Sequence, residues 1–168
     1  MNFARLEKPL DDSASSESFY VSQSNVHGFG VFAARDLTAG EPVVRLRGDL
    51  AQGSDALADP DYIGIGPDMW IDPEHPLDYI NHSCEPNCAF GPRRMLMSLR
   101  PIAKDDELLI DYSATELDES WTLECSCKTS SCRGTLKAIH LTFTDPACPP
   151  VASPLVLRYW ARALQQRN

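Results

Sequence analysis

Short apolar runs, separated by turn-forming residues, follow one another along the chain from Phe19 to Tyr112. Each run is three to five residues long, which is typical of β-strands and too short for helices. Thirteen prolines and nine glycines punctuate the sequence, and no long helical period appears before residue 150. The pattern therefore predicts an all-β or mostly β domain. The predicted strands are residues 19–21, 31–33, 42–46, 62–65, 69–71, 95–99 and 107–110.

Three segments depart from this pattern. Residues 1–18 are rich in Asp, Ser and Glu, and we expect them to form a flexible arm. Residues 48–60 predict a surface excursion between strands. Residues 153–167 predict a helix, because Ser153 suits the N-cap and Pro154 the first helical position. Its apolar side chains share one face, so we expect this helix to pack against the domain.

Composition and charge narrow the class of protein. The length of 168 residues favours one domain with small appendages. No apolar run approaches the roughly 20 residues that span a bilayer, and residues 1–18 match neither a signal nor a transit peptide. We therefore expect an intracellular protein, cytoplasmic by default because no basic run resembles a nuclear signal. The net charge of −9 opposes direct nucleic-acid binding and favours a basic partner, although solubility alone would explain it equally.

The cysteines indicate a metal site. In a reducing compartment, six cysteines favour metal ligation or free thiols over disulfides. Cys125, Cys127 and Cys132 fall within eight residues and suit three corners of a tetrahedral zinc site. Spacing alone leaves the fourth ligand open. The candidates are Cys84, Cys88, Cys148, His82 and His140.

Three further motifs carry candidate chemistry. Residues 27–33 imitate a dinucleotide-binding fingerprint, but they lack the strand before and the helix after it, which leaves a glycine-flexed loop or an ordinary turn. Residues 81–87 read NHSCEPN and place small polar groups, able to bond backbone or ligand, directly after an apolar pair. Residues 105–112 form an acidic strand ending in Tyr112, which by itself could simply pack.

The order of these motifs resembles the SET family with its post-SET zinc segment, over residues 19–136. The resemblance implies a minimal member: a SET domain at 19–113, a post-SET zinc-binding segment at 114–136 and a C-terminal extension with a helix at 137–168. It also implies a fold of small curved sheets with a pseudo-knotted core, in which the Asn81 segment passes beneath the loop before Tyr112.

The resemblance implies an enzyme. Members use S-adenosylmethionine to methylate lysine side chains of proteins and release S-adenosylhomocysteine. The substrate would be a lysine-containing basic protein, such as a histone, a ribosomal protein or the chain itself. Two alternatives remain open, namely a non-catalytic protein-binding module on the same fold and a zinc-dependent scaffold without cofactor.

The resemblance further assigns individual residues. The cofactor site would consist of Gly28, Phe29, Gly30, Tyr79, Asn81 and His82. Within it, the glycine loop would offer backbone to the methionine portion, Asn81 would hold the amino end, and the His82 backbone would meet the adenine. Tyr112 would be the catalytic tyrosine beside the transferring methyl, with Tyr62 as a second tyrosine of the substrate channel.

The remaining implied roles concern the metal and the product. Cys84 would complete the Zn²⁺ site of Cys125, Cys127 and Cys132, with Cys88 and Cys148 left free. Ile110 would line the substrate channel where matching members have Phe or Tyr; being apolar and smaller than Phe, it predicts di- or trimethylation. Two departures from the family pattern stand out. Asp78 replaces an Arg, and residues 135–137 supply none of the aromatics that often cover the adenine.

Overall fold

The computed structural model describes residues 18–52, 61–66, 69–116 and 120–138. The predicted arm (except Ser18), the predicted helix at 153–167, Cys148 and His140 lie outside the described residues. In the described part of the chain, no helix is long and apolar enough to cross a membrane.

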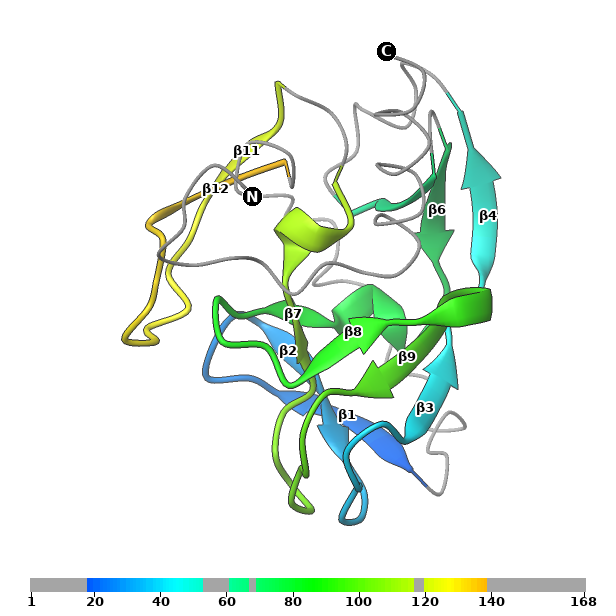
Figure 1. Cartoon of the computed structure of the whole chain (residues 1–168), viewed down its shortest axis with the longest axis vertical. Helices are drawn as coiled ribbons and strands as arrows, with labels where there is room; N and C mark the ends of the chain where they lie inside the picture. Colours follow the sequence, from blue (N-terminus) through cyan, green and yellow to red (C-terminus); the bar gives the residue numbers. More distant parts are fainter. Residues whose placement is uncertain (1–17, 53–60, 67–68, 117–119, 139–168) are drawn as a thin grey trace, which may run out of the picture.

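Short strands in small sheets make up most of the described structure (Figure 1). The strands are β1 (Phe19–Gln23), β2 (Phe29–Ala33), β3 (Pro42–Arg45), β4 (Gly48–Ala51), β5 (Ile63–Gly66), β6 (Met69–Pro73), β7 (Asn81–His82), β8 (Cys88–Phe90), β9 (Met95–Ser98), β10 (Leu109–Ile110), β11 (Thr122–Glu124) and β12 (Thr135–Lys137). The 3-10 turns among them are η3 (Leu77–Tyr79), η4 (Pro92–Arg94) and η5 (Tyr112–Ala114).

The sheets are almost all antiparallel. β1 and β2 form one hairpin and β11 and β12 another, and Figure 1 shows the two hairpins in different parts of the molecule. Strands β3-β9-β8 and β4-β6-β5 form two three-stranded sheets. The exception is β7, which pairs in parallel with β10.

The core lies between the inner faces of these sheets. Strand β2 shows how the sequence builds it: Val31 and Ala33 are buried, whereas Phe32 between them is half-exposed and stacks on Tyr20 of β1 with ring centroids 5.6 Å apart. This alternation is what a strand with one buried face requires. The largest fully buried side chains are Leu37, Leu46, Ile71, Leu77, Leu96, Ile102, Leu108, Ile110, Leu136 and Val31.

The mostly β prediction is confirmed, and every predicted run overlaps a strand. The predicted excursion at 48–60 is wrong in its first part, because Gly48–Ala51 form β4 and pair with β6. Leu50 of this strand is 59% exposed, so no buried alternation marks it in the sequence. Strands β7, β8, β11 and β12 escaped prediction because two or three residues are too few to show a period.

The parallel pairing positions the candidate site. Leu109 faces Asn81 and Ile110 faces His82 across the β7–β10 pair. The carboxamide of Asn87 extends this pairing, since its Oδ1 accepts from the Leu109 N–H at 2.8 Å and its Nδ2 donates to the Glu107 carbonyl at 2.7 Å. The motif at 81–87 and the strand before Tyr112 are thereby held side by side.

Candidate functional site

The turn between β1 and β2 lies against the side chain of Asn81. Gly28 in this turn has φ of +50°, in the left-handed region that favours glycine. The Asn81 Nδ2 donates to the carbonyls of His27 at 3.1 Å and Phe29 at 2.9 Å, and to the carboxylate of Glu107 at 2.8 Å. Asn81 is buried, so one side chain ties the glycine turn to strand β7.

The neighbouring residues complete this corner of the molecule. Gly30 is buried, and a Cβ at that position would collide with the Glu107 carboxylate. The ring of Phe29 packs edge-on against that of Tyr79 with centroids 5.9 Å apart. The structure thus brings together five of the residues predicted for the cofactor site, which are Gly28, Phe29, Gly30, Tyr79 and Asn81. The sixth, His82, follows Asn81 in β7, but its side chain contacts Cys84 and Tyr112.

Tyr112 lies at a cavity lined by residues from several segments of the chain. Its hydroxyl donates to the Ile80 carbonyl at 2.7 Å, and its backbone N–H donates to His82 Nδ1 at 3.2 Å. The ring lines a cavity of about 70 Å³ together with Tyr62. Ile110 is buried in the core and is not among the side chains that line this cavity. The other lining residues are Asp61, Ile63, Leu77, Ile80, Thr115, Glu116 and Trp121.

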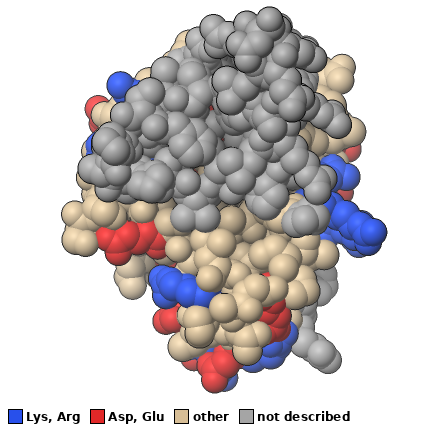
Figure 2. Space-filling view, in the orientation of Figure 1, with Lys and Arg blue, Asp and Glu red and all other residues tan. Residues whose placement is uncertain are grey.

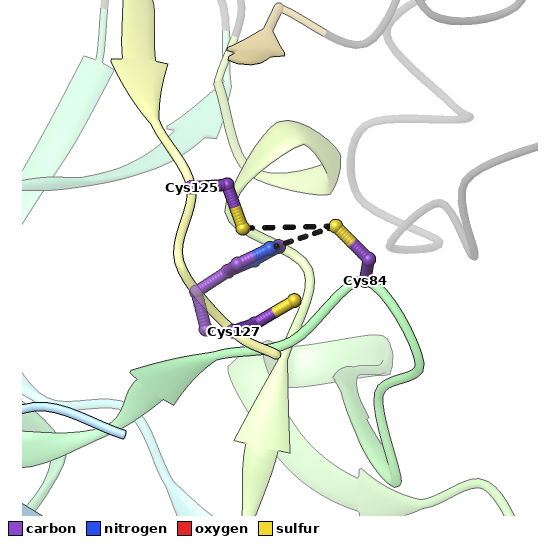
Figure 3. Close-up of side chains that lie close together, drawn as sticks. Cys84, Cys125 and Cys127 are labelled. Atoms are coloured by element: carbon purple, nitrogen blue, oxygen red, sulfur yellow. Dashed lines mark hydrogen bonds between the residues drawn. The ribbon is translucent and has the colours of Figure 1, made fainter. Parts of the chain in front are cut away.

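A cluster of thiols lies close to this site. Figure 3 shows the sulfurs of Cys84, Cys125 and Cys127 converging from two segments, one after β7 and one between β11 and β12. The Sγ atoms of Cys84 and Cys125 are 3.8 Å apart, and those of Cys125 and Cys132 are 3.7 Å apart. The ligand atoms of His82, Cys84, Cys125 and Cys127 all lie within 4.8 Å of one another. This donor set suits Zn²⁺.

Several nitrogen atoms lie within hydrogen-bonding distance of the sulfur of Cys84. The backbone N–H and the Nε of Arg133 each lie 3.4 Å from Cys84 Sγ, and His82 Nε2 lies at the same distance. Burial raises the pKa of the Cys84 thiol, whereas the hydrogen bonds and charge of Arg133 lower it. Burial is the larger effect and the pKa of Cys84 is raised overall, so the donors from Arg133 offset only part of the cost of forming the thiolate that binds metal.

Arg133 also joins the thiol cluster to the strand that ends in Tyr112. Its Nη2 donates to Asp111 Oδ1 at 2.5 Å, and both side chains are largely buried. Burial alone would lower the pKa of Arg133, but the hydrogen bond and charge of Asp111 outweigh it and raise that pKa. Asp111 Oδ1 in turn accepts from the Ser113 N–H and caps the η5 turn that contains Tyr112.

Comparison with known proteins identifies the fold family. Residues 28–113, which are 86 of the 168 in the chain, match the family model described as the SET domain. The chain belongs to the SET domain family. The observed fold of small, mostly antiparallel sheets is the SET fold, as the resemblance implied.

Several histone-lysine methyltransferases are similar to this chain. The "Histone-lysine N-methyltransferase trithorax" of Drosophila virilis is 34% identical over 135 residues, covering 67% of this chain and 3% of that protein. The "Histone H3-lysine(4) N-trimethyltransferase ATX1" of Arabidopsis thaliana is 34% identical over 134 residues, covering 67% of this chain and 12% of that protein. The chain therefore spans only a small part of these relatives.

Solved structures show the same likeness. The crystal structure of KRYPTONITE in complex with mCHG DNA and SAH superposes with a TM-score of 0.57 at 27% identity. It covers 70% of this chain and 28% of that one.

Four residues of this SET domain site were missed from the sequence. Asp111 and Arg133 stand inside the motifs at 105–112 and 132–134, but nothing in their spacing indicates that they pair across 22 positions. Asn87 closes the NHSCEPN motif, and only the fold reveals its strand-like bonding. Glu107 belongs to an acidic run, where an exposed charge is the default interpretation. The departure at Asp78 is buried, with Oδ1 3.5 Å from His75 Nδ1.

The first prediction concerns the ion pair between Arg133 and Asp111. We expect Arg133→Ala to lower the free energy of unfolding by about 3 kcal/mol, because it leaves the buried Asp111 carboxylate without its charged partner. Urea unfolding measures the change. Arg47→Ala, at an exposed arginine, is the matched control and should shift stability by no more than about 0.5 kcal/mol. Equal effects of the two substitutions would show that the ion pair does not anchor this segment.

Proposed function

We propose that this SET domain transfers methyl groups from S-adenosylmethionine to lysine side chains of a basic protein, with histone H3 as the first candidate. The observation that carries the proposal is the placement of Tyr112, whose phenol oxygen is oriented by the Ile80 carbonyl in the wall of a cavity that Tyr62 shares. Strand β7 connects this cavity to the Asn81 corner, by which we mean Gly28, Phe29, Gly30, Tyr79 and Asn81. The names of the relatives, which include histone-lysine and histone H3-lysine(4) methyltransferases, support the same reaction.

The residues of the Asn81 corner fit the cofactor. The turn at Gly28 and the buried Gly30 leave backbone carbonyls close to Asn81. Asn81 would hold the amino end of the cofactor, Gly28, Phe29 and Gly30 its methionine portion, and Tyr79 and the His82 backbone its adenine side. When bound, S-adenosylmethionine supplies the activated methyl group on its sulfonium. The residues of the chain then have to orient the amine and keep water out.

Tyr112 is suited to orient the reacting groups. Its hydroxyl donates to the Ile80 carbonyl, which fixes the position of the phenol oxygen, and such an oxygen can also accept from the amine or the polarised methyl. The apolar walls at Ile63, Leu77 and Ile80 and the positive sulfonium of a bound cofactor would lower the pKa of an entering lysine from its ordinary value of roughly 10.4, whereas carboxylates in the same cavity act in the opposite direction. The proposed step therefore needs alignment more than it needs a strong base.

The charged residues suggest how the substrate is attracted. On the face shown in Figure 2, basic and acidic side chains of the described residues are interspersed, so no broad acidic surface is seen there. Two acidic residues, Asp61 and Glu116, do line the cavity beside Tyr112. We propose that these two carboxylates, together with the net charge of −9, favour a lysine from a basic protein such as a histone or a ribosomal protein. With a histone substrate the protein would act on chromatin; the cytoplasmic expectation applies to the other substrates.

We propose Cys84, Cys125, Cys127 and Cys132 as the zinc ligands. Tetrahedral thiolates with Zn–S bonds of about 2.3 Å lie about 3.8 Å apart, and the Cys84–Cys125 and Cys125–Cys132 distances of 3.8 and 3.7 Å agree with this. His82 is the competing fourth ligand. Its Nδ1 accepts from the Tyr112 N–H, so its proton must sit on Nε2, and no lone pair remains there for a metal. In this assignment His82 donates to the Cys84 thiolate instead.

The division of the chain follows from this assignment. We propose a SET domain at 19–113 and a post-SET zinc-binding segment at 114–136, with an arm at 1–18 and an extension at 137–168. Strand β12 continues to Lys137, one residue past the proposed boundary. The parallel pairing of β7 with β10 supports the pseudo-knotted core.

The second prediction concerns the number of methyl groups added. We propose that Ile110 permits di- or trimethylation: its side chain is buried and does not line the cavity itself, but it stands two residues before Tyr112 and has no polar atom to hold a water or an amine. Mass spectrometry of the product at long reaction times should show di- or trimethyl-lysine for the wild type. Ile110→Tyr should shift the product toward monomethyl-lysine, and Ile110→Phe is the size-matched control without a hydroxyl. A wild type that makes only monomethyl-lysine contradicts the proposal.

Two measurements test the proposed function itself. Titration calorimetry should show binding of S-adenosylmethionine, which a zinc scaffold without cofactor would not give. Transfer of a labelled methyl group to histone H3, to a ribosomal-protein mixture and to the chain itself, read by mass spectrometry, should then locate the modified lysine. Binding of the cofactor without transfer to any of these proteins would favour the non-catalytic module.

A further inference from the structure

Three acceptors surround the amide nitrogen of Asn81. They are the carbonyls of His27 and Phe29 and the carboxylate Oε1 of Glu107, at 3.1, 2.9 and 2.8 Å. All three groups can only accept hydrogen bonds when the carboxylate is ionised, so the atom that they face must be the nitrogen of the amide. The Asn81 carboxamide therefore has one defined orientation, with its oxygen directed away from these acceptors.

This corner has more acceptors than its own donors can use. An amide nitrogen carries two hydrogens, and three acceptors share them. One of the acceptors carries a full negative charge in a half-buried position. A group with several donors and a positive charge would satisfy this surplus, and a primary ammonium, with three donors and no acceptor, is such a group.

The Glu107 carboxylate is held in place from several directions. Its Oε2 accepts from the Ser24 hydroxyl at 2.9 Å, which leaves Oε1 for Asn81. The absence of a Cβ at Gly30 makes room for the carboxylate. Its backbone forms a bridge with Phe32 of β2. Glu107 thus stands at a fixed point between the glycine turn and Asn81.

We propose that Glu107 is a determinant of cofactor binding: its carboxylate orients the Asn81 carboxamide and supplies the negative charge that attracts the α-ammonium of S-adenosylmethionine. This inference rests on the proposed function and adds a residue and a charge to it. It also gives Gly30 a specific role, since any side chain at that position would displace the Glu107 carboxylate. Ser24, in the turn directly after β1, donates a hydrogen bond to the other oxygen of the same carboxylate.

The test compares two ligands that differ at the amino-acid end. S-adenosylmethionine carries the α-ammonium, whereas 5′-methylthioadenosine keeps the nucleoside and sulfur but has no amino-acid portion. We expect Glu107→Gln to weaken S-adenosylmethionine binding by about ten- to a hundredfold in calorimetry, because a charge-assisted interaction is lost. The affinity for 5′-methylthioadenosine should stay unchanged. Ser24→Ala should weaken S-adenosylmethionine binding by a smaller factor, and Glu74→Gln, at an exposed glutamate, should change neither affinity.

Each result has a distinct meaning. If Glu107→Gln lowers the affinity for both ligands equally, Glu107 is merely a structural residue and the inference is overturned. The inference is also overturned if the affinity for neither ligand falls. If Glu107→Gln does not fold, the inference is decided by Ser24→Ala, which must weaken S-adenosylmethionine selectively. A wild-type protein that binds neither ligand contradicts the proposed function. If the wild type binds both ligands and Glu107→Gln leaves both affinities unchanged, only this inference is contradicted.

Discussion

Removal of zinc is expected to unfold residues 120–138 as a unit and to abolish methyl transfer. The segment has little apolar core of its own, since all three residues of β11 are exposed and β12 buries only Leu136. One buried leucine contributes about 1.5–3 kcal/mol, whereas a structural zinc contributes on the order of 10 kcal/mol in small peptides. The metal term is the larger by far, so the segment should not persist without it.

Hydrogen exchange with and without a chelator measures this loss of structure, and metal analysis measures the zinc content. Cys84→Ser should lose both zinc and the protection of residues 120–138. Cys88→Ala is the matched control, because Cys88 is buried in the core, where burial raises the pKa of its thiol to about 12 and keeps it neutral. Zinc content unchanged in Cys84→Ser would show that the ligand set is wrong.

The fourth ligand can be identified in the same experiment. Cys132→Ser should lose zinc, whereas His82→Gln should keep it, because the proposed role of His82 is to donate from Nε2 to Cys84. The opposite pattern would make His82 the ligand, with Cys132 outside the coordination sphere.

Tyr112→Phe is expected to lower kcat by at least about a hundredfold, the size of effect seen when one oriented polar group is removed from a transition state. The hydroxyl oxygen would act on the reacting groups and not on the bound cofactor. The Kd for S-adenosylmethionine should therefore stay within about twofold of the wild type. Losing the bond to the Ile80 carbonyl costs about 1 kcal/mol of stability, too little to unfold the protein.

Steady-state kinetics and calorimetry separate these two effects. Tyr20→Phe is the control, because the Tyr20 hydroxyl bonds Asp105 at 3.0 Å on the exposed side of the β1–β2 hairpin. It should leave kcat unchanged. Tyr62→Phe should reduce turnover only if Tyr62 acts as the second channel tyrosine. Ordinary turnover in Tyr112→Phe would mean that this tyrosine only packs.

The two departures from the family pattern bear on cofactor affinity. Asp78 replaces a usual arginine, and it lies buried with its Oδ1 3.5 Å from His75 Nδ1. The residues after Gly134 form β12, in which Leu136 points into the core and Thr135 and Lys137 are exposed. None of them offers an aromatic ring to an adenine.

The sequence alone determined the class of the fold and, through the order of its motifs, the resemblance to the SET family that the comparison confirmed. Short apolar runs between prolines and glycines form short strands, because too few residues separate the turns for a helix to nucleate. Roles for Asn81, Cys84 and Tyr112 could be proposed because these residues belong to short contiguous motifs that resemble those of the family. Such motifs keep their spacing in the sequence and can be found there.

Only the tertiary structure decided which distant residues meet. Asp111 and Arg133, Asn81 and Glu107, and Ser24 and Glu107 are separated by 22, 26 and 83 positions. Nothing periodic links such positions, because contacts between strands depend on register and topology rather than on spacing along one element. The fourth corner of the thiol cluster is undecided by spacing for the same reason. It depends on the position that β7 gives to Cys84 and on which nitrogen of His82 accepts the hydrogen bond from the Tyr112 N–H. Both are properties of the folded chain.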